Sequence, residues 1–167
     1  GRELGGAQLP VGTINEYGGV LKNEALIWVN VKYRRRLERQ SLTTGATTPL
    51  AVSGESNDSP IWSPDGKSVA FVVRERGQHL LAIMNTDGTN RRVFPDLNVR
   101  ADSWWARWSP DSRYLGYITA DAHQLRLYDQ STRTTKSLVA DTSIRIGQWI
   151  WRADSKSIST VATRRQS

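Results

Sequence analysis

Two histidines, His79 and His123, are the residues of this chain best suited to acid–base chemistry. A serine hydrolase would combine one of them with a serine nucleophile and a carboxylate. Both histidines, however, occupy equivalent positions of a sequence repeat, each at the start of a short apolar segment. The string nearest to a G-x-S-x-G nucleophile motif, GESND from Gly54, lacks the closing glycine. We therefore expect both histidines to be structural and the chain to be non-catalytic.

The sequence also lacks the usual signals of a cofactor site. The glycine pairs Gly5-Gly6 and Gly18-Gly19 have neither the lysine-serine nor the G-x-G-x-x-G context of a phosphate-binding loop. The absence of cysteine excludes disulfides, thiolate metal sites and cysteine nucleophiles. We expect no bound cofactor.

Two groups of aspartates could be mistaken for metal ligands. Asp65, Asp111 and Asp154 fall in turns of three different repeat units, so they cannot converge on one ion. A second group precedes the first strand of three units and consists of Asp58, Asp102 and Asp141. Carboxylates of that group could meet near a central axis and hold a cation. We favour capping or turn hydrogen bonds as their role, and we predict no metal site.

The residues above are positioned by a repeat of about 44 residues. Trp62, Trp108 and Trp151 are separated by 46 and 43 residues, and Tyr17 lies 45 residues before Trp62. The segments WSPDGKSVAFVV, WSPDSRYLGYIT and WRADSKSISTVA follow one pattern. Repeats of this length indicate a stacked or circular array of similar units. The chain therefore contains about four units, which start near residues 17, 62, 108 and 151.

Each unit contains short apolar runs typical of β-strands. These runs have four to six residues, are rich in Val, Ile, Tyr and Phe, and are bounded by Gly, Pro, Asp, Asn or Ser. Four short strands per repeat are typical of a β-propeller blade. A β-sandwich would not repeat its sequence, and a β-solenoid repeat is usually shorter. We predict an all-β, propeller-like array of about four four-stranded antiparallel blades, the last incomplete, with the ring open or completed by another chain.

Within each unit, the tryptophan is expected to end the first strand and to fill the gap between adjacent sheets. The Pro and Asp that follow it favour a tight turn, because Pro fixes its own φ and Asp-Gly suits a hairpin. The residues assigned to this structural motif are Trp62, Pro64, Asp65, Gly66, Trp108, Pro110, Asp111, Trp151 and Asp154. The motif therefore predicts architecture and gives no catalytic role to its members.

The repeat resembles that of the TolB-like propeller family. The second unit matches that family's pattern at Pro60, Trp62, Ser63, Pro64, Asp65, Gly66, Lys67, Val69, Ala70, Phe71, Asn85, Asp87, Gly88, Arg92 and Phe94. The similarity covers roughly residues 17–162, and the motif is specific for fold rather than function. The resemblance implies a propeller of six or more blades that binds proteins, often in the bacterial periplasm. Similar repeats also form propellers of prolyl-oligopeptidase-like enzymes and of membrane-anchored bacterial sensors.

The domain organisation follows from the repeat. We expect residues 17–167 to form the propeller segment and residues 1–16 to form an extended N-terminal arm. The hydrophobic content of 38% and the mean hydropathy of −0.52 fit a soluble globular protein, and no run of 18 apolar residues is present. We expect no transmembrane segment.

The positive charge of the chain is concentrated in one set of predicted loops. The formal net charge is +7 and the pI is near 10.1, which favours an acidic partner. In a blade, the loops between the second and third strands emerge on the same face as the connections between blades. The basic residues of these loops, which we predict to bind a partner, are Lys32, Arg34, Arg35, Arg36, Arg74, Arg76, Arg164 and Arg165. The connections between blades are more acidic, with Glu55, Asp58, Asp96, Asp102 and Asp141 against Arg100 and Arg145.

These observations predict an interaction subunit. The chain would dock through its basic loops on an acidic protein or an anionic, membrane-associated partner, within a larger periplasmic or otherwise extracytoplasmic assembly. Arginine suits such a role because its guanidinium pairs with carboxylate and phosphate groups. Nucleic acid is not expected, because the basic loops lack interleaved aromatic residues other than Tyr33. The alternative is a regulatory propeller segment of a prolyl-oligopeptidase-like serine peptidase or of a membrane-anchored bacterial sensor.

Overall fold

The computed structural model describes residues 25–30, 36–50, 56–100 and 106–164. These residues form thirteen β-strands and no helix. The strands are β1 (Ala25–Asn30), β2 (Arg36–Ser41), β3 (Thr47–Pro49), β4 (Ser56–Trp62), β5 (Ser68–Glu75), β6 (Gln78–Asn85), β7 (Arg92–Asn98), β8 (Ala106–Trp108), β9 (Tyr114–Ile118), β10 (Gln124–Asp129), β11 (Thr134–Ala140), β12 (Ile144–Trp151) and β13 (Ile158–Arg164).

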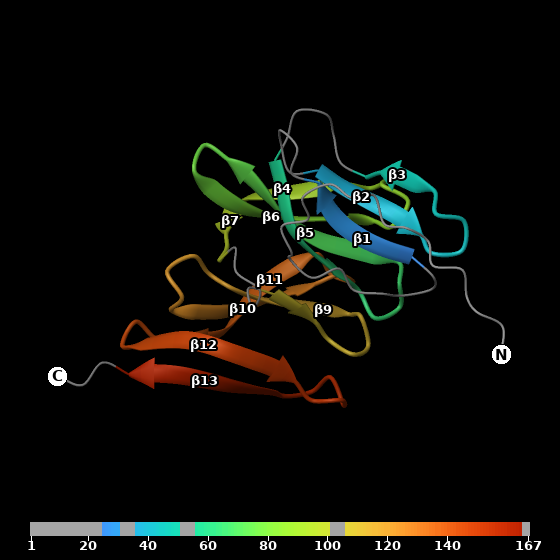
Figure 1. Cartoon of the computed structure of the whole chain (residues 1–167). Coiled ribbons are helices and arrows are strands. Elements are labelled where there is room, and N and C mark those ends of the chain that lie inside the picture. Colours follow the sequence, from blue (N-terminus) through green and yellow to red (C-terminus); the bar gives the residue numbers. More distant parts are fainter. Residues whose placement is uncertain (1–24, 31–35, 51–55, 101–105, 165–167) are drawn as a thin grey trace.

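The strands form four antiparallel sheets in chain order. Strands β4 to β7 and strands β8 to β11 make two complete four-stranded meanders, in which each strand pairs with the next. The sheet before them contains β1, β2 and β3, and the sheet after them contains β12 and β13. Figure 1 shows the sheets stacked in sequence, from β1–β3 at the upper right to β12–β13 at the bottom. The predicted array of propeller blades is confirmed, and the ring is not closed.

The apolar segments form strands because their neighbours bury them on one or both sides. In β5, six consecutive residues from Ser68 to Val73 are buried, as is expected for a strand covered on both faces. In β13, by contrast, every residue after the half-buried Ile158 is exposed. The two complete sheets therefore hold most of the core, and the described part of the last sheet is covered on one side only.

The repeated tryptophan-containing motif ends one strand and begins a tight turn, as predicted. Trp62, Trp108 and Trp151 are the last residues of β4, β8 and β12. In the second sheet, the Ser63 hydroxyl donates to Asp65 Oδ1 at 2.5 Å and accepts from the Ser68 backbone N–H at 2.9 Å. The third sheet repeats this arrangement with its own serine, aspartate and turn residues. The repeated turn is therefore held by a local hydrogen-bond network.

The same motif also connects adjacent blades. The indole Nε1–H of Trp108 donates to the Ile61 carbonyl at 3.2 Å, and that of Trp151 donates to the Arg107 carbonyl at 3.2 Å. These bonds span 47 and 44 residues, which is one repeat. Each tryptophan therefore both fills space and fixes the position of its blade against the preceding one.

A second bond between blades uses a serine of the turn. The Ser112 hydroxyl accepts from the Asp65 backbone N–H at 2.9 Å, and the Ser155 hydroxyl accepts from that of Asp111 at 3.0 Å. Ser112 and Ser155 have φ values of 64° and 58°, a conformation that usually favours glycine. Gly66 occupies the equivalent position in the second unit. The serines therefore adopt a less favoured backbone conformation and provide a hydrogen bond that glycine lacks.

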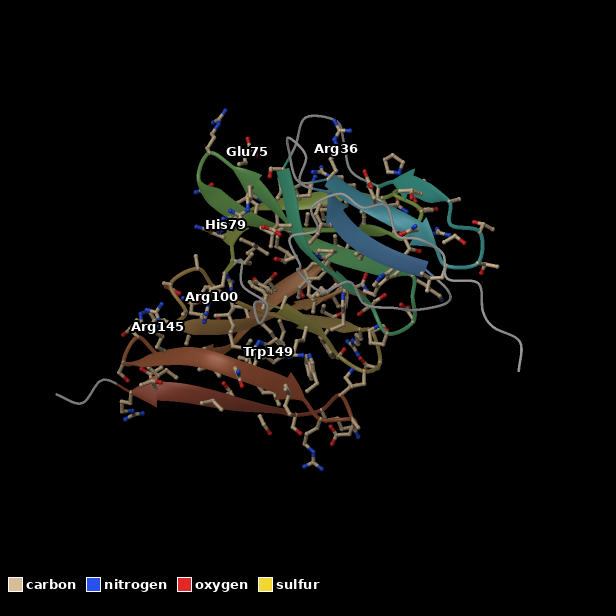
Figure 2. All side chains as sticks on the ribbon, viewed as in Figure 1. Arg36, Glu75, His79, Arg100, Arg145 and Trp149 are labelled. Carbon is tan, nitrogen blue, oxygen red and sulfur yellow. The ribbon has the colours of Figure 1, made fainter. Side chains whose placement is uncertain are left out.

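The last sheet is held against the third by a tryptophan that the repeat does not predict. Trp149 on β12 is 1% exposed and packs in a cluster with Ile118, Leu125 and Ile146. Its ring lies directly over Gly116 on β9, where a Cβ would clash with the ring. Figure 2 shows Trp149 between β12 and the sheet above it. The interface between these two blades thus depends on the absence of a side chain at residue 116.

Candidate interaction surface

The loops sort into two sets on opposite sides of the stacked sheets. The turns β5–β6 and β9–β10, together with the connection before β12, lie on the left in Figure 1. The turns β4–β5, β8–β9 and β12–β13 lie on the right. In Figure 2, Glu75, His79, Arg100 and Arg145 follow the left side from top to bottom. This side, which we call the connector face, is the one predicted to bind a partner.

Arg74 on the connector face is bonded to a buried carboxylate. Its Nε and Nη2 atoms donate to Asp58 Oδ2 at 3.0 and 2.7 Å. The Asp58 side chain is 3% exposed, whereas that of Arg74 is 38% exposed. A buried carboxylate needs such a partner, because an uncompensated charge in the interior is strongly destabilising. Arg74 therefore has a structural contact that a partner would have to share.

Arg76 and Arg36 are both exposed at the connector face. The Arg76 side chain is 91% exposed, and its nearest carboxylate oxygen, on Glu75, is 3.9 Å away. Arg76 has a φ of 49° in the turn between β5 and β6, so it projects from a strained position. Arg36 is the exposed first residue of β2. Because both side chains are exposed, both guanidinium groups are accessible to an acidic ligand. The surface ion pair of Arg76 with Glu75 contributes little free energy, so a ligand can replace it.

The lower part of the connector face is more neutral than the sequence suggests. Arg164 Nη2 lies 3.9 Å from Asp141 Oδ2. The Ser143 hydroxyl and backbone N–H both donate to Asp141 Oδ1, at 2.7 and 2.8 Å. These bonds, with a smaller contribution from Arg164, lower the pKa of Asp141 below its ordinary value. Asp141 is therefore held in a turn, in agreement with the hydrogen-bonding role we favoured for it.

Arg100 bridges blades at this face. Its Nη1 donates to the Ile146 carbonyl of β12 at 3.0 Å, and its backbone N–H donates to the Ile118 carbonyl of β9 at 3.2 Å. The side chain is half-buried. Arg100 therefore joins the second, third and fourth sheets near the connections between blades.

Part of the predicted charge pattern falls outside the described residues. Four of the predicted binding residues lie outside them, namely Lys32, Arg34, Arg35 and Arg165. Glu55 and Asp102 of the predicted acidic zone also lie outside them, and the side chain of Asp96 is not among those described. The described side chains of the connector face include six arginines and four carboxylates. The arginines are Arg36, Arg74, Arg76, Arg100, Arg145 and Arg164, and the carboxylates are those of Asp58, Glu75, Asp121 and Asp141.

Positive charge also gathers on the opposite side, which sequence reasoning did not single out. The turns there contain six basic residues and four carboxylates. The basic residues are Lys67, Arg91, Arg113, Arg133, Arg152 and Lys156, and the carboxylates are those of Asp65, Asp87, Asp111 and Asp154. Among the described residues, the excess charge is therefore not confined to the connector face. The β4–β5, β8–β9 and β12–β13 turns of that second side carry the repeated motif, so the sequence predicts architecture there rather than binding.

The two histidines occupy equivalent positions, at the start of the third strand of each blade. The His79 carbonyl accepts from the Val99 backbone N–H at 2.8 Å, and the His123 carbonyl accepts from that of Asp141 at 3.4 Å. The His123 ring nitrogen Nδ1 lies 2.5 Å from the Ile144 carbonyl. Both residues thus contribute to the connection from one blade to the next.

Within the described parts of the chain, no three His, Asp or Glu side chains are grouped so that they could hold a metal ion. Asp65, Asp111 and Asp154 each accept a backbone N–H from two residues further along their own turns. None of the described segments forms a helix that is long and apolar enough to cross a membrane.

Comparison with known proteins identifies the fold. No family model matches the chain. Among solved structures, TolB from Acinetobacter baumannii matches 86% of this chain with a TM-score of 0.65 and 22% identity, and the chain covers 36% of that protein. The β-propeller domain of the trilobed protease from Pyrococcus furiosus, which has an open velcro topology, matches 83% of this chain with a TM-score of 0.59 and 17% identity. The chain covers 45% of that domain.

A curated relative matches a shorter part of the chain. An uncharacterised peptidase, YuxL of Bacillus subtilis, is 33% identical over 73 residues, which are 43% of this chain and 11% of the peptidase. The chain thus spans less than half of the length of each of these three proteins. It has the fold of a partial TolB-like propeller, a fold that occurs both in TolB and in a propeller domain of a protease.

Proposed function

We propose that the chain is a non-catalytic propeller segment that docks an acidic protein partner through its connector face. The observation that carries this proposal is the exposure of two arginine side chains, that of Arg36 at the start of β2 and that of Arg76 in the β5–β6 turn. Exposed arginines of this kind steer association and select partners by charge. The fold is compatible with such a role, because each described histidine and motif serine serves a structural contact.

The unpaired strand edge is a second surface for assembly. Among the described residues, β13 pairs only with β12, and Val161 on it is 66% exposed. An exposed strand edge readily accepts another strand. We propose that further strands, from this chain or from a partner, complete the last blade, and that the working assembly is extracytoplasmic, as the TolB-like resemblance implies.

The test uses the chain and the partner that co-purifies with it from its native host. The partner is purified, and its dissociation constant is measured for the double variant Arg36→Gln/Arg76→Gln over a range of salt concentrations. We expect affinity to fall about tenfold and the salt dependence to weaken, because two charge-assisted contacts are lost. Lys67→Gln is the matched control, since Lys67 is an exposed cation in the β4–β5 turn, on the opposite side.

Two results would count against docking at the connector face. One is an unchanged dissociation constant in the double variant, and the other is an equal loss in Lys67→Gln. Vesicles with and without anionic lipid serve as a further arm. Binding that requires anionic vesicles and occurs without the protein partner would replace the proposed protein partner with a membrane surface.

The second candidate is a regulatory propeller segment of a serine peptidase or of a sensor protein. The peptidase alternative is favoured by the 73-residue match to the Bacillus subtilis peptidase. The sequence of the complete gene distinguishes the candidates. A G-x-S-x-G nucleophile region or a kinase or DNA-binding region in the same open reading frame would support this second function, whereas its absence would favour the interaction subunit.

A further inference from the structure

A groove lies between the third blade and the last sheet. It has a volume of about 720 Å³. One wall consists of side chains from β9, β10 and β11, and the other consists of side chains from β12, β13 and the turn between them. Leu138 on β11, which lines the groove, is 45% exposed. We call this space the outer groove.

The outer groove occupies the same repeat position as a smaller pocket between the second and third blades. That pocket has a volume of about 380 Å³. On the wall that the preceding blade provides, four residues of the pocket correspond to four residues of the groove. Ser68, Ile83, Arg92 and Phe94 line the pocket, and Tyr114, Leu127, Lys136 and Val139 line the groove at the same positions of the repeat. The two spaces are therefore equivalent sites in successive interfaces between blades.

The opposite walls of the two spaces differ. In the smaller pocket, that wall comes from the third strand of the next blade, β10, and from the turn after it. Phe94 packs edge to face against Tyr128 of β10, with ring centroids 5.0 Å apart. In the outer groove, the wall comes from β12 and β13, the first two strands of the last sheet. Among the described residues, no third strand pairs with β13, so the position that β10 takes in the third blade is open in the last sheet.

A β-bulge in β11 places two apolar residues in the outer groove. Leu125 pairs with Val139 and Arg126 pairs with Ser137, so Leu138 is the extra residue of the bulge. Bulges change the direction of side chains, and Leu138 and Val139 both line the groove. Val139 has the repeat position of Phe94, so it would contact the residue of an added third strand that corresponds to Tyr128. Such a strand would bury apolar surface that is now exposed.

The charge at one end of the outer groove indicates how the added strand should end. In the third blade, Arg113 donates to Asp129, the last residue of β10, at 2.9 Å. Lys156 has the repeat position of Arg113, because each follows its turn aspartate by two residues and donates its backbone N–H to that aspartate. Lys156 is within ion-pair distance of no described carboxylate. A strand antiparallel to β13 would run toward the β12–β13 turn, so a carboxylate at its end would lie near Lys156.

We propose that the outer groove binds an extended segment of a partner protein by strand addition to β13. The segment runs antiparallel to β13, places apolar side chains against Leu138 and Val139, and ends in an aspartate or glutamate beside Lys156. In complexes of this kind, main-chain bonds provide affinity and alternate side chains provide specificity. The inference rests on the strand edge of the proposed function and names the chemistry of the strand that completes the last blade. The acidic end of the segment agrees with the acidic partner proposed above.

The test measures the binding of labelled peptides to the full chain by fluorescence anisotropy. The probe is HQLRLYDQ, residues 123–130, because β10 takes the equivalent position in the third blade. A peptide of the same composition in scrambled order is the control for strand pairing. We expect the probe to bind more tightly than the scrambled peptide. The Asp129→Asn peptide should bind about two- to fivefold more weakly than the probe, because a surface ion pair is lost.

A charge reversal in the chain tests the predicted orientation. Lys156→Glu should weaken probe binding by at least about threefold, and the Asp129→Lys peptide should bind this variant better than the probe does. Lys67→Glu is the matched control. Lys67 has the same repeat position as Lys156, in a sheet whose third strand is present.

Several outcomes would overturn the proposal. It is wrong if the probe does not bind, or if the scrambled peptide binds equally well. It is also wrong if Lys156→Glu binds the probe as the native chain does, or if Lys67→Glu loses as much affinity. Self-association of the chain that the probe abolishes, measured by sedimentation, would replace the partner protein with a second copy. Arg36→Gln/Arg76→Gln should bind the probe normally, because both arginines lie outside the outer groove, so this proposal and docking at the connector face can fail separately.

Discussion

Replacing Gly116 with alanine perturbs the interface between the third and fourth blades at one atom. A Cβ at residue 116 would lie 2.9 and 3.1 Å from the Cζ3 and Cζ2 atoms of Trp149 and closer still to Cη2. The ring cannot easily move away. Trp149 is 1% exposed and packs edge to face against Trp151, at a centroid distance of 6.0 Å. Trp151 is in turn stacked on Tyr114, with ring centroids 6.3 Å apart.

The expected cost of Gly116→Ala is about 1–3 kcal/mol, the usual range for overpacking a well-packed core. Alanine in a strand would otherwise stabilise by about 0.5–1 kcal/mol relative to glycine, because it restricts the unfolded chain. Complete displacement of the Trp149 ring would cost about 3–5 kcal/mol, which sets the upper limit. Steric strain therefore outweighs the backbone gain, and the melting temperature should fall by about 2–4 °C for each kcal/mol.

The assay is urea unfolding followed by circular dichroism, with Gly116→Ala, Trp149→Leu and the double variant compared in one cycle. If the added methyl group acts through the ring, Gly116→Ala should cost little once Trp149 is leucine, and the coupling energy should be about 1–3 kcal/mol. Gly147→Ala is the control. Gly147 also lies within a strand, and a Cβ there would meet only the Val161 carbonyl, at 3.3 Å. A Gly116→Ala variant as stable as the native chain, or a cost that persists in the Trp149→Leu background, would refute the reasoning.

Two further predictions concern the bonds between blades and the turn aspartates. Trp108→Phe removes the indole bond to the Ile61 carbonyl, so we expect a loss of about 1 kcal/mol from that bond, and a further loss from the smaller ring, in urea unfolding; an unchanged stability would contradict the role given to this bond. The pKa values of Asp111 and Asp121 are lowered chiefly by the hydroxyls of Ser109 and Thr119, and that of Asp129 chiefly by Arg113. Because these folded-state pKa values lie below those of the unfolded chain, their stabilisation is present above about pH 4 and is lost as the pH falls through the folded values. The melting temperature should therefore decrease from about pH 5 downwards, and Asp129→Asn should show a smaller decrease; an equal decrease would argue against Asp129 as a contributor.

The repeat made most of the architecture predictable from the sequence. The spacing of Trp62, Trp108 and Trp151 predicted where three first strands end, and the structure has those residues at the ends of β4, β8 and β12. The sequence could predict this because the constraint is local. A tryptophan, a proline and an aspartate favour one turn wherever they occur together.

The contacts between blades were less predictable, because they depend on pairs of residues in different units. When the units are aligned, Gly116 occupies the same repeat position as Ala70, and Trp149 occupies the same position as Ala106. In the interface between the second and third blades, Ala70 and Ala106 belong to one buried cluster. In the next interface, a missing side chain on one strand accommodates a large ring on the other. Each of these two residue differences, considered alone, looks like ordinary variation between repeats. Only the fold shows that the smaller residue at one position compensates for the larger residue at the other.

The candidate sites were predictable to an even smaller extent. The basic loops of the connector face were evident from the sequence, but the contact between Arg74 and the buried Asp58 was not, since the two residues lie on neighbouring strands. The pocket between the second and third blades was not predicted either, because Phe94 and Tyr128, which line it, belong to different units. Their adjacency follows from the stacking of two blades, which the sequence of one unit does not reveal.

The central claim is that the repeated motif builds the fold whereas the loops of the connector face bind the partner. The most direct test is the dissociation constant of the co-purified partner, measured for Arg36→Gln/Arg76→Gln and for Trp108→Phe at a temperature where both variants are folded. The account predicts about tenfold weaker binding by the arginine variant with native stability, and native binding by the less stable tryptophan variant. The reverse pattern, with binding lost in Trp108→Phe and retained in the arginine variant, would contradict it.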